Sequence, residues 1–285
     1  MSYVSGRTSE LLAELPVVLS DARRLVHAAD GDAGAEAYRV LALGHRLGAG
    51  LAGRLGLNDL AWTSAERALA AARRSTAPEL EAAVSLRYLA WVLVRQGRVI
   101  EAEQVALRAA EAIEPRMLDR DRARAGGFGN LMFNAASAAT VAGRPEKARE
   151  YLAVARSAAA LYGVGQSSEA AIFGPRVVGL HAVETAVRTG EPALALRLAE
   201  KLPAADGAVP RFWEAGHRLH MAKAAVELRR TREGLSYLQQ ARELAPVWSS
   251  LQPLGRSTMT TLVERSARRR DGAFAELASH YGVAG

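Results

Sequence analysis

Glycine returns at one place in a repeating pattern, and this spacing constrains the fold more than any other feature of the chain. Gly56, Gly97, Gly143 and Gly190 are separated by 41, 46 and 47 residues, and Arg229 stands at the matching place 39 residues later. Glycine readily takes the left-handed conformation that ends many helices. The spacing therefore predicts five turns, each joining the two helices of a repeated pair.

Small residues stand at fixed distances from these five turn positions. Five residues after the turn come Ala61, Ala102, Ala148, Ala195 and Gly234. Seven residues further along come Ala68, Ala109, Ala155, Leu202 and Ala241, and seven residues before the turn come Ala49, Ala90, Ala136, Val183 and Ala222. Small side chains at these places let two helices pack closely, which is the tetratricopeptide pattern. We therefore predict an all-α fold, a tetratricopeptide-like right-handed superhelix of about five helix pairs. The period exceeds the usual ~34 residues of that repeat, so longer helices are expected.

The pattern divides the chain into three parts of one continuous domain. Residues 1–34 hold a leading helix, predicted over 7–29, and residues 35–248 hold the repeats. Residues 249–285 form a C-terminal capping helical pair, which is needed because an open end of a repeat array exposes apolar surface. Pro246 is expected to end the last repeat, and Val247–Pro253 is expected to be a linker.

The charge pattern favours a solvated surface over a nucleic-acid site. The formal net charge is +7, but Arg is interleaved with Glu through most predicted helices. The dense cluster of Arg265, Arg268, Arg269 and Arg270 is more typical of an exposed helix face than of a phosphate site. Reading a DNA sequence requires several side chains that reach base edges, and every predicted helix is committed to stacking or capping. We expect no sequence-specific DNA binding by this chain alone.

Composition and the N-terminal sequence favour a cytoplasmic protein. The chain has no cysteine, which excludes disulfides and thiolate chemistry and fits an intracellular location. Its start has no basic segment followed by an apolar run and a cleavage site, so we expect no export signal. The longest uncharged run, Ala125–Gly143, contains Asn130 and Asn134 and no compact block of Leu, Ile and Val. We expect it to be a buried helix, with no membrane association.

Two motifs match known sites by letter and are better explained by packing. Gly48–Gly53 has the spacing of a dinucleotide-binding loop, but that loop requires a preceding strand and this match lies within a helical pattern. Glu214, His217 and His220 share one helical face at a spacing that suits metal ligands, but no fourth ligand is evident, so polar groove residues are the preferred interpretation. We expect no cofactor, no metal and no catalytic residue, and therefore no enzyme.

The first helix of each pair lines the concave side of such a superhelix, where ligands bind. Counted from the turns, this side combines aromatic walls with Asn, Arg and His, which can fix a carboxylate, a peptide backbone or polar oxygens. A small molecule or peptide is the expected ligand, and a protein partner or a homodimer is left open. The predicted groove residues are Arg46, Arg87, Trp91, Asn130, Phe133, Asn134, Ser137, His181, Glu184, Arg188, His220, Lys223 and Glu227.

At IFGPRVVGLHAVETAVRTG, residues 172–190, the chain resembles the sensor half of actinobacterial regulators, in which an Xre-type helix-turn-helix precedes tetratricopeptide-like repeats. Segments 55–72, 143–159, 232–246 and 274–283 also resemble successive parts of that family. The chain departs from the family pattern at four places. Arg176 and Val177 replace a usual Thr-Asn, His220 stands where Asp is common, and Lys223 stands where Arg is common.

The resemblance implies a ligand-sensing module of the transcriptional-regulator type. No helix-turn-helix precedes the repeats in this sequence, so two alternatives stay open: a sensor fragment of a longer regulator, or a stand-alone peptide-binding or protein-binding adaptor in a biosynthetic or signalling pathway. A repurposed biosynthetic enzyme is the least favoured alternative.

Overall fold

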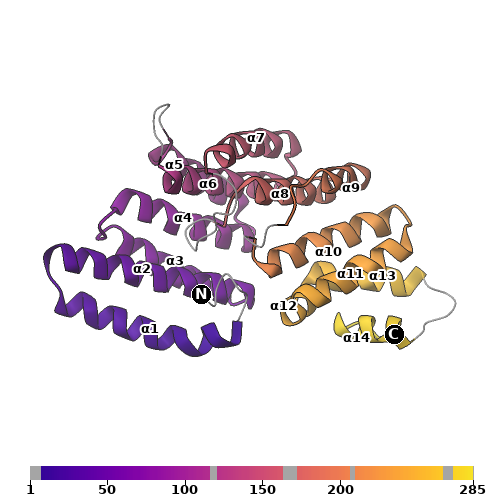
Figure 1. Cartoon of the computed structure of the whole chain (residues 1–285), viewed down its shortest axis with the longest axis horizontal. Coiled ribbons are helices and arrows are strands. Elements are labelled where there is room, and N and C mark those ends of the chain that lie inside the picture. Colours follow the sequence, from indigo (N-terminus) through magenta and orange to yellow (C-terminus); the bar gives the residue numbers. More distant parts are fainter. Residues whose placement is uncertain (1–7, 116–120, 163–171, 206–208, 266–271, 285) are drawn as a thin grey trace. The chain divides into compact units, whose positions relative to one another are not determined.

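Every regular element of the described chain is an α-helix. The computed structural model describes residues 8–115, 121–162, 172–205, 209–265 and 272–284 (Figure 1), and within them lie fourteen helices and no strand. The chain divides into two compact units, Met1–Val178 and Gly179–Gly285, whose boundary falls inside helix α8. The predicted all-α repeat fold is confirmed.

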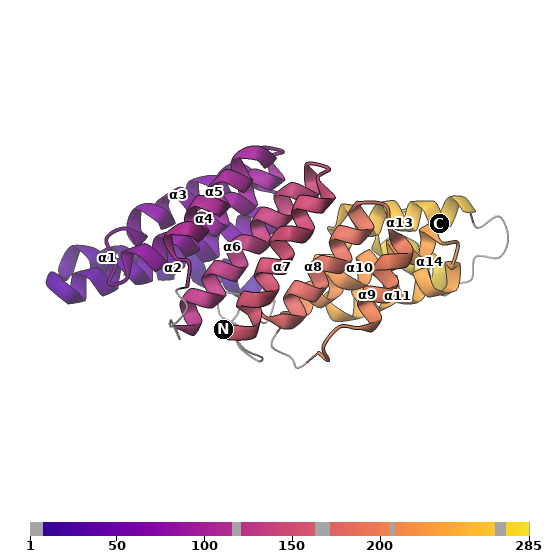
Figure 2. The ribbon, with the colours of Figure 1, turned by 90° about the horizontal axis from the view of Figure 1, so that it is seen from above.

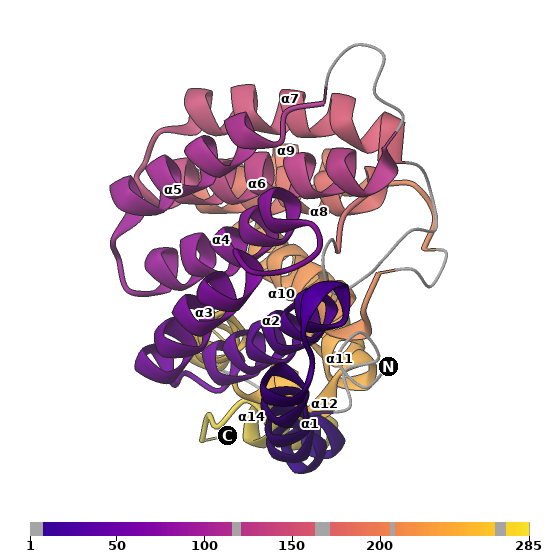
Figure 3. The same cartoon turned by 90° about the vertical axis from the view of Figure 1, so that its left-hand side faces the viewer.

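The first unit is a stack of antiparallel helices in which each helix packs against the next. In addition, α2 packs against α4, and α4 packs against α6, so the first helices of successive pairs form one layer (Figures 2 and 3). This layer carries the predicted groove residues of the unit. The helices are α1 (Thr8–Ala28), α2 (Gly31–Arg54), α3 (Asn58–Ala72), α4 (Pro78–Arg95), α5 (Val99–Ala112), α6 (Arg122–Val141) and α7 (Pro145–Tyr162).

The second unit begins within α8 and ends in a helical cap. One buried cluster joins α8, α9 and α10 through Val183, Leu196 and Met221, and a larger cluster joins α10 and α11 to α13 and α14. The phenol of Tyr281, at the end of α14, donates to the Leu238 carbonyl at 2.8 Å and so fixes the cap to α11. The helices are α8 (Pro175–Arg188), α9 (Pro192–Glu200), α10 (Arg211–Glu227), α11 (Thr231–Leu244), α12 (Pro246–Ser250), α13 (Pro253–Arg265) and α14 (Gly272–His280).

All five predicted turn positions adopt the left-handed conformation. The four glycines have φ between 71° and 80°, and Arg229, the one non-glycine residue with positive φ in the described chain, has φ 60°. In each turn the next residue donates its N–H to the carbonyl five residues earlier, as in Leu57 to Ala52 at 2.9 Å and Arg230 to Ala225 at 2.8 Å. This is the Schellman motif, and its five copies confirm the register that the glycine spacing predicts.

The small residues of the repeat pattern lie where helices meet. Ala61, Ala102, Ala148 and Ala195 have no exposed surface, and neither have Ala49 and Ala222. Fourteen of the twenty residues of α6 are buried, as expected for the uncharged run. In the described ranges no helix combines the length and apolarity that crossing a membrane would require.

Two boundaries differ from the sequence-based prediction. Helix α2 begins at Gly31, four residues before the predicted start of the repeats. The predicted linker after Pro246 instead contains the short helix α12. Proline at the first position of a helix costs no hydrogen bond, because the N–H there has no partner inside the helix, so Pro246 starts a helix as well as ending one.

Candidate ligand-binding site

Six predicted groove residues lie on α8 and α10, which are the first helices of the two helix pairs in the second unit. They stand nine, six and two residues before the turn position, and residues three and four apart share one face of a helix. On α8 these are His181, Glu184 and Arg188, and on α10 they are His220, Lys223 and Glu227. The structure joins the first three to one another and to His220, whereas Lys223 and Glu227 form a separate ion pair at 2.9 Å.

Glu184 is the centre of this polar cluster. One carboxylate oxygen lies 3.1 Å from Nδ1 of His181, and the other lies 2.8 Å from Nε of Arg188 and 3.9 Å from Nε2 of His220. The side chains of Glu184 and His220 keep 21% and 16% of their surface exposed, so both can be reached from solvent. We call Glu184, His181, Arg188 and His220 the Glu184 cluster.

The surroundings hold Glu184 ionised and His220 neutral. Burial opposes ionisation of the Glu184 carboxyl, but His220, His181 and Arg188 outweigh it and lower its pKa well below the usual range. For His220, burial is the largest effect and lowers the pKa, Arg188 and His181 act in the same direction, and the Glu184 carboxylate opposes them. At neutral pH the cluster therefore combines a carboxylate, a guanidinium and a neutral imidazole.

An aromatic ring that the sequence pattern did not single out borders the cluster. The ring of Trp213, on α10, meets the ring of His181 edge to face, with 5.2 Å between centroids. Trp213 stands seven residues before His220, a spacing that puts two residues on one face of a helix. This spacing could have pointed to Trp213.

The predicted residues of α6 are mostly committed to the fold. Asn130 and Asn134 are buried; the amide of Asn130 donates to the Ile172 carbonyl at 3.2 Å, and the amide of Asn134 donates to the Asn130 carbonyl at 2.7 Å. Phe133 is buried, and Ser137 is half-buried. The Asn130 amide thus ties α6 to the segment that leads into α8, and the Asn134 amide bonds within α6.

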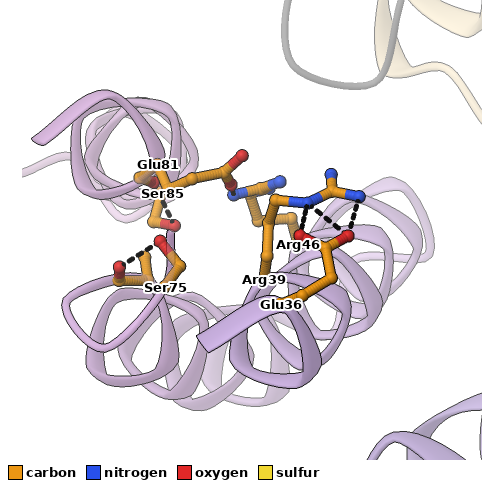
Figure 4. A network of polar contacts seen from close by, with 7 residues as sticks. Glu36, Arg39, Arg46, Ser75, Glu81 and Ser85 are labelled. Atoms are coloured by element: carbon orange, nitrogen blue, oxygen red, sulfur yellow. Dashed lines mark hydrogen bonds and ion pairs between the residues drawn. The ribbon is translucent and has the colours of Figure 1, made fainter. Parts of the chain in front are cut away.

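Arg46 is buried in an ion pair. Its Nη1 lies 2.5 Å from Oε2 of Glu81, beside the exposed pair of Arg39 and Glu36 (Figure 4). The Ser85 hydroxyl donates to the Glu81 backbone carbonyl one turn along α4. Arg46 therefore joins α2 to α4, which is a structural role that the groove prediction did not include.

Arg87 and Trp91 lie on α4 with different surroundings. The guanidinium of Arg87 lies 3.9 Å from the centre of the Tyr88 ring, and the residue is buried. Trp91 is half-buried and packs so closely on Gly53 that a Cβ at that glycine would lie 2.4 Å from the indole. The glycine-rich string Gly48–Gly53 therefore lies inside α2, as predicted, and at Gly53 the absence of a side chain lets the Trp91 ring pack closely.

The remaining sequence motifs are the His and Glu residues of α10 and the arginine cluster near the C-terminus. Glu214 and His217 are buried on α10. Across the described ranges, no three His, Asp, Glu or Cys side chains gather closely enough to hold a metal ion. Of the arginine cluster, Arg265 donates to the Val226 carbonyl at 2.7 Å, and Arg268, Arg269 and Arg270 lie outside the described residues.

Comparison with known proteins finds a structure with a similar fold but identifies no family. The chain is similar in structure to BtubC (BKLC) from P. vanneervenii. The TM-score is 0.53 at 15% sequence identity, and the alignment covers 93% of this chain and 96% of that chain. No family model matches the sequence, and no curated protein matches it. At this identity the likeness supports the helical-repeat fold alone.

Proposed function

We propose that this chain is a ligand-sensing helical-repeat module that binds a small molecule or peptide at the Glu184 cluster. The observation that supports this most directly is the convergence of His181, Arg188 and His220 on the Glu184 carboxylate, which remains partly open to solvent. Burying a charge costs folding free energy, and groups with strongly shifted pKa values concentrate at functional sites.

The chemistry of the cluster suits a ligand that is polar at one end and apolar at the other. Glu184 accepts hydrogen bonds, the Arg188 guanidinium donates them, and a neutral imidazole such as that of His220 does both. Trp213 adds an apolar ring next to His181. Convergent polar groups beside an aromatic wall are typical of small-molecule sites.

The resemblance to regulator sensor regions favours a sensor of that type, in which ligand binding here changes the activity of a DNA-binding partner or segment. The alternative is a stand-alone adaptor that binds a peptide or protein. The coding sequence upstream of Met1 distinguishes the two, because an in-frame helix-turn-helix there supports the regulator and its absence supports the adaptor.

A thermal-shift screen with a defined library of metabolites and short peptides tests binding. A ligand at one hundred times its dissociation constant adds about 2.7 kcal/mol to the free energy of unfolding. Each tenfold loss of affinity lowers that gain by about 1.4 kcal/mol. We expect Glu184→Gln to weaken a hit at least tenfold.

Glu233→Gln is the matched control, because Glu233 lies on α11, outside the Glu184 cluster, and forms an exposed ion pair with Arg230. It should leave the affinity unchanged. A hit that binds wild type and Glu184→Gln equally well would place the ligand elsewhere and contradict the proposal.

A further inference from the structure

A second surface, in the first unit, combines tryptophan and arginine side chains near the turns at Gly56 and Gly97. The guanidinium of Arg98 lies 5.0 Å from the centre of the Trp62 ring, and that of Arg95 lies 5.2 Å from the centre of the Trp91 ring. Both tryptophans pack against the same buried cluster between α2, α3 and α4. We call Trp62, Trp91, Arg95 and Arg98 the Trp–Arg strip.

The two arginines of the strip differ in their partners. Arg98 forms an exposed ion pair with Glu101 at 2.5 Å. Arg95 donates through Nε to the Asn58 side-chain oxygen at 3.3 Å, and across the described ranges it has no carboxylate partner. Neighbouring groups partly desolvate the Arg95 guanidinium and lower its pKa, although the residue as a whole is exposed.

Three exposed apolar side chains stand close in sequence to residues of the strip or to Asn58, the partner of Arg95. Leu57 and Leu60 flank the segment that contains Asn58, and Ile100 follows Arg98 by two residues. All three are between 51% and 56% exposed. Large apolar side chains exposed together mark interaction sites more often than single ones do.

We propose that the Trp–Arg strip binds an acidic peptide segment in which Asp or Glu lies next to apolar side chains. Arg95 supplies a charge-assisted bond to a carboxylate, and the leucines, Ile100 and the tryptophan rings cover the apolar neighbours. The charge balance favours a carboxylate over a nucleic-acid backbone. Arg98 is already paired, and Asp59 lies exposed between Asn58 and Leu60, so the strip lacks the several open cations that phosphate tracking requires.

The strip shares no residue with the Glu184 cluster, and the proposal stands whatever binds at that cluster. Selection from a randomised peptide library displayed on phage, with the full chain as bait, provides the probe. We expect selected peptides to be enriched in Asp or Glu beside Leu, Ile, Phe or Trp. Affinity of a labelled selected peptide is then measured by fluorescence anisotropy.

Variants at exposed positions locate the binding surface without disturbing the core. Arg95→Gln should weaken the selected peptide about tenfold or more, because hydrogen bonds to charged groups are the stronger ones. Arg108→Gln, at an exposed position on α5, should have no effect. Leu60→Glu and Leu60→Lys remove the same apolar side chain, so a weaker affinity for Leu60→Glu than for Leu60→Lys isolates the charge of the ligand.

Circular dichroism and thermal melting of each variant check that it is folded. The proposal is overturned if no peptide is enriched over bait-free selection, or if the enriched peptides are basic or uncharged. It is also overturned if Arg95→Gln binds as wild type does, or if single-stranded oligonucleotides compete for the strip more tightly than the acidic peptides.

Discussion

Arg46 on α2 and Glu81 on α4 join the first helices of the first two pairs through an ion pair whose Nη1–Oε2 distance is 2.5 Å. The Arg46 side chain keeps only 2% of its surface exposed, and the Glu81 side chain keeps 14%. A pair this deep is expensive to break, because removal of one charge leaves the other desolvated.

Glu81→Gln is therefore expected to lower the free energy of unfolding by about 3–5 kcal/mol. The double variant Arg46→Met with Glu81→Leu should lose much less, because apolar side chains of similar volume often replace a buried pair at little cost. Urea denaturation of the single and double variants measures both values.

Glu101→Gln serves as the control for this pair. Glu101 pairs with Arg98 at the surface, and exposed pairs contribute about 0–1 kcal/mol. Equal losses for Glu81→Gln and Glu101→Gln would show that burial of the Arg46–Glu81 pair adds nothing to stability.

Arg229 occupies a turn position that holds glycine in the other four repeats. Its φ of 60° is costly for a residue with a Cβ by about 1–2 kcal/mol. Arg229→Gly should therefore stabilise the protein by about 1 kcal/mol, even after the greater flexibility of glycine in the unfolded chain is counted. Gly97→Ala should destabilise it, although a Cβ at Gly97 would meet no atom within 4 Å. If thermal unfolding shifts the melting temperatures of both variants in the same direction, backbone conformation is ruled out as the cause.

The repeat register was predictable because it rests on local chemistry. A left-handed turn position and small residues at fixed distances are imposed by the geometry of each helix pair, so they are visible in the sequence even where Arg replaces Gly. The start of α2 and the existence of α12 were less predictable, since helix ends depend on one or two residues. Pro246 can end one helix or start the next with the same backbone angle.

The candidate site was predictable only as sets of residues that share one face of a helix. The spacing of His181, Glu184 and Arg188 places them on one face of α8, and the structure joins them. The burial of Asn130 depends on the Ile172 carbonyl, 42 residues away in sequence, and the partner of Arg46 is 35 residues away. Such partners are set by packing between helices, and no local pattern in the sequence reveals them.

The Phe173 ring packs directly against Gly129 of α6. A Cβ at Gly129 would lie 2.2 Å from the Phe173 ring, and that ring is buried. Gly129→Ala should destabilise the protein by about 1–3 kcal/mol, the usual range for an overfilled core. Chemical denaturation of Gly129→Ala, Phe173→Leu and the double variant measures the coupling, which should make the double variant more stable than the sum of the single losses predicts.

Gly48→Ala provides the comparison within a helix. A Cβ at Gly48 would lie 3.6 Å from the nearest atoms, an ordinary contact distance. Ala is favoured over Gly inside a helix by roughly 0.5–1 kcal/mol, so this variant should be more stable than wild type. A loss of stability at Gly48 as large as that at Gly129 would mean that helix distortion, and not the Phe173 ring, is responsible.

His45 on α2 makes stability depend on pH. Burial is the largest effect and lowers its pKa from 6.5 to about 4, and the charges of Arg23 and Arg67 act in the same direction. Between these two values the unfolded chain binds a proton that the folded chain excludes, so stability is present above pH 6.5 and is lost as the pH falls toward 4. The full shift corresponds to roughly 3 kcal/mol.

The contribution of His45 is measured by urea denaturation at a series of pH values from 7.5 to 4. In the His45→Gln variant the part of the pH dependence that belongs to this residue should disappear, so the difference in free energy of unfolding between wild type and variant should shrink or reverse as the pH falls. His27→Gln, at an exposed position on α1, should leave the wild-type profile in place. A difference between wild type and His45→Gln that stays constant from pH 7.5 to 4 would contradict the assignment, because a group whose protonation is linked to folding cannot contribute equally on both sides of its titration.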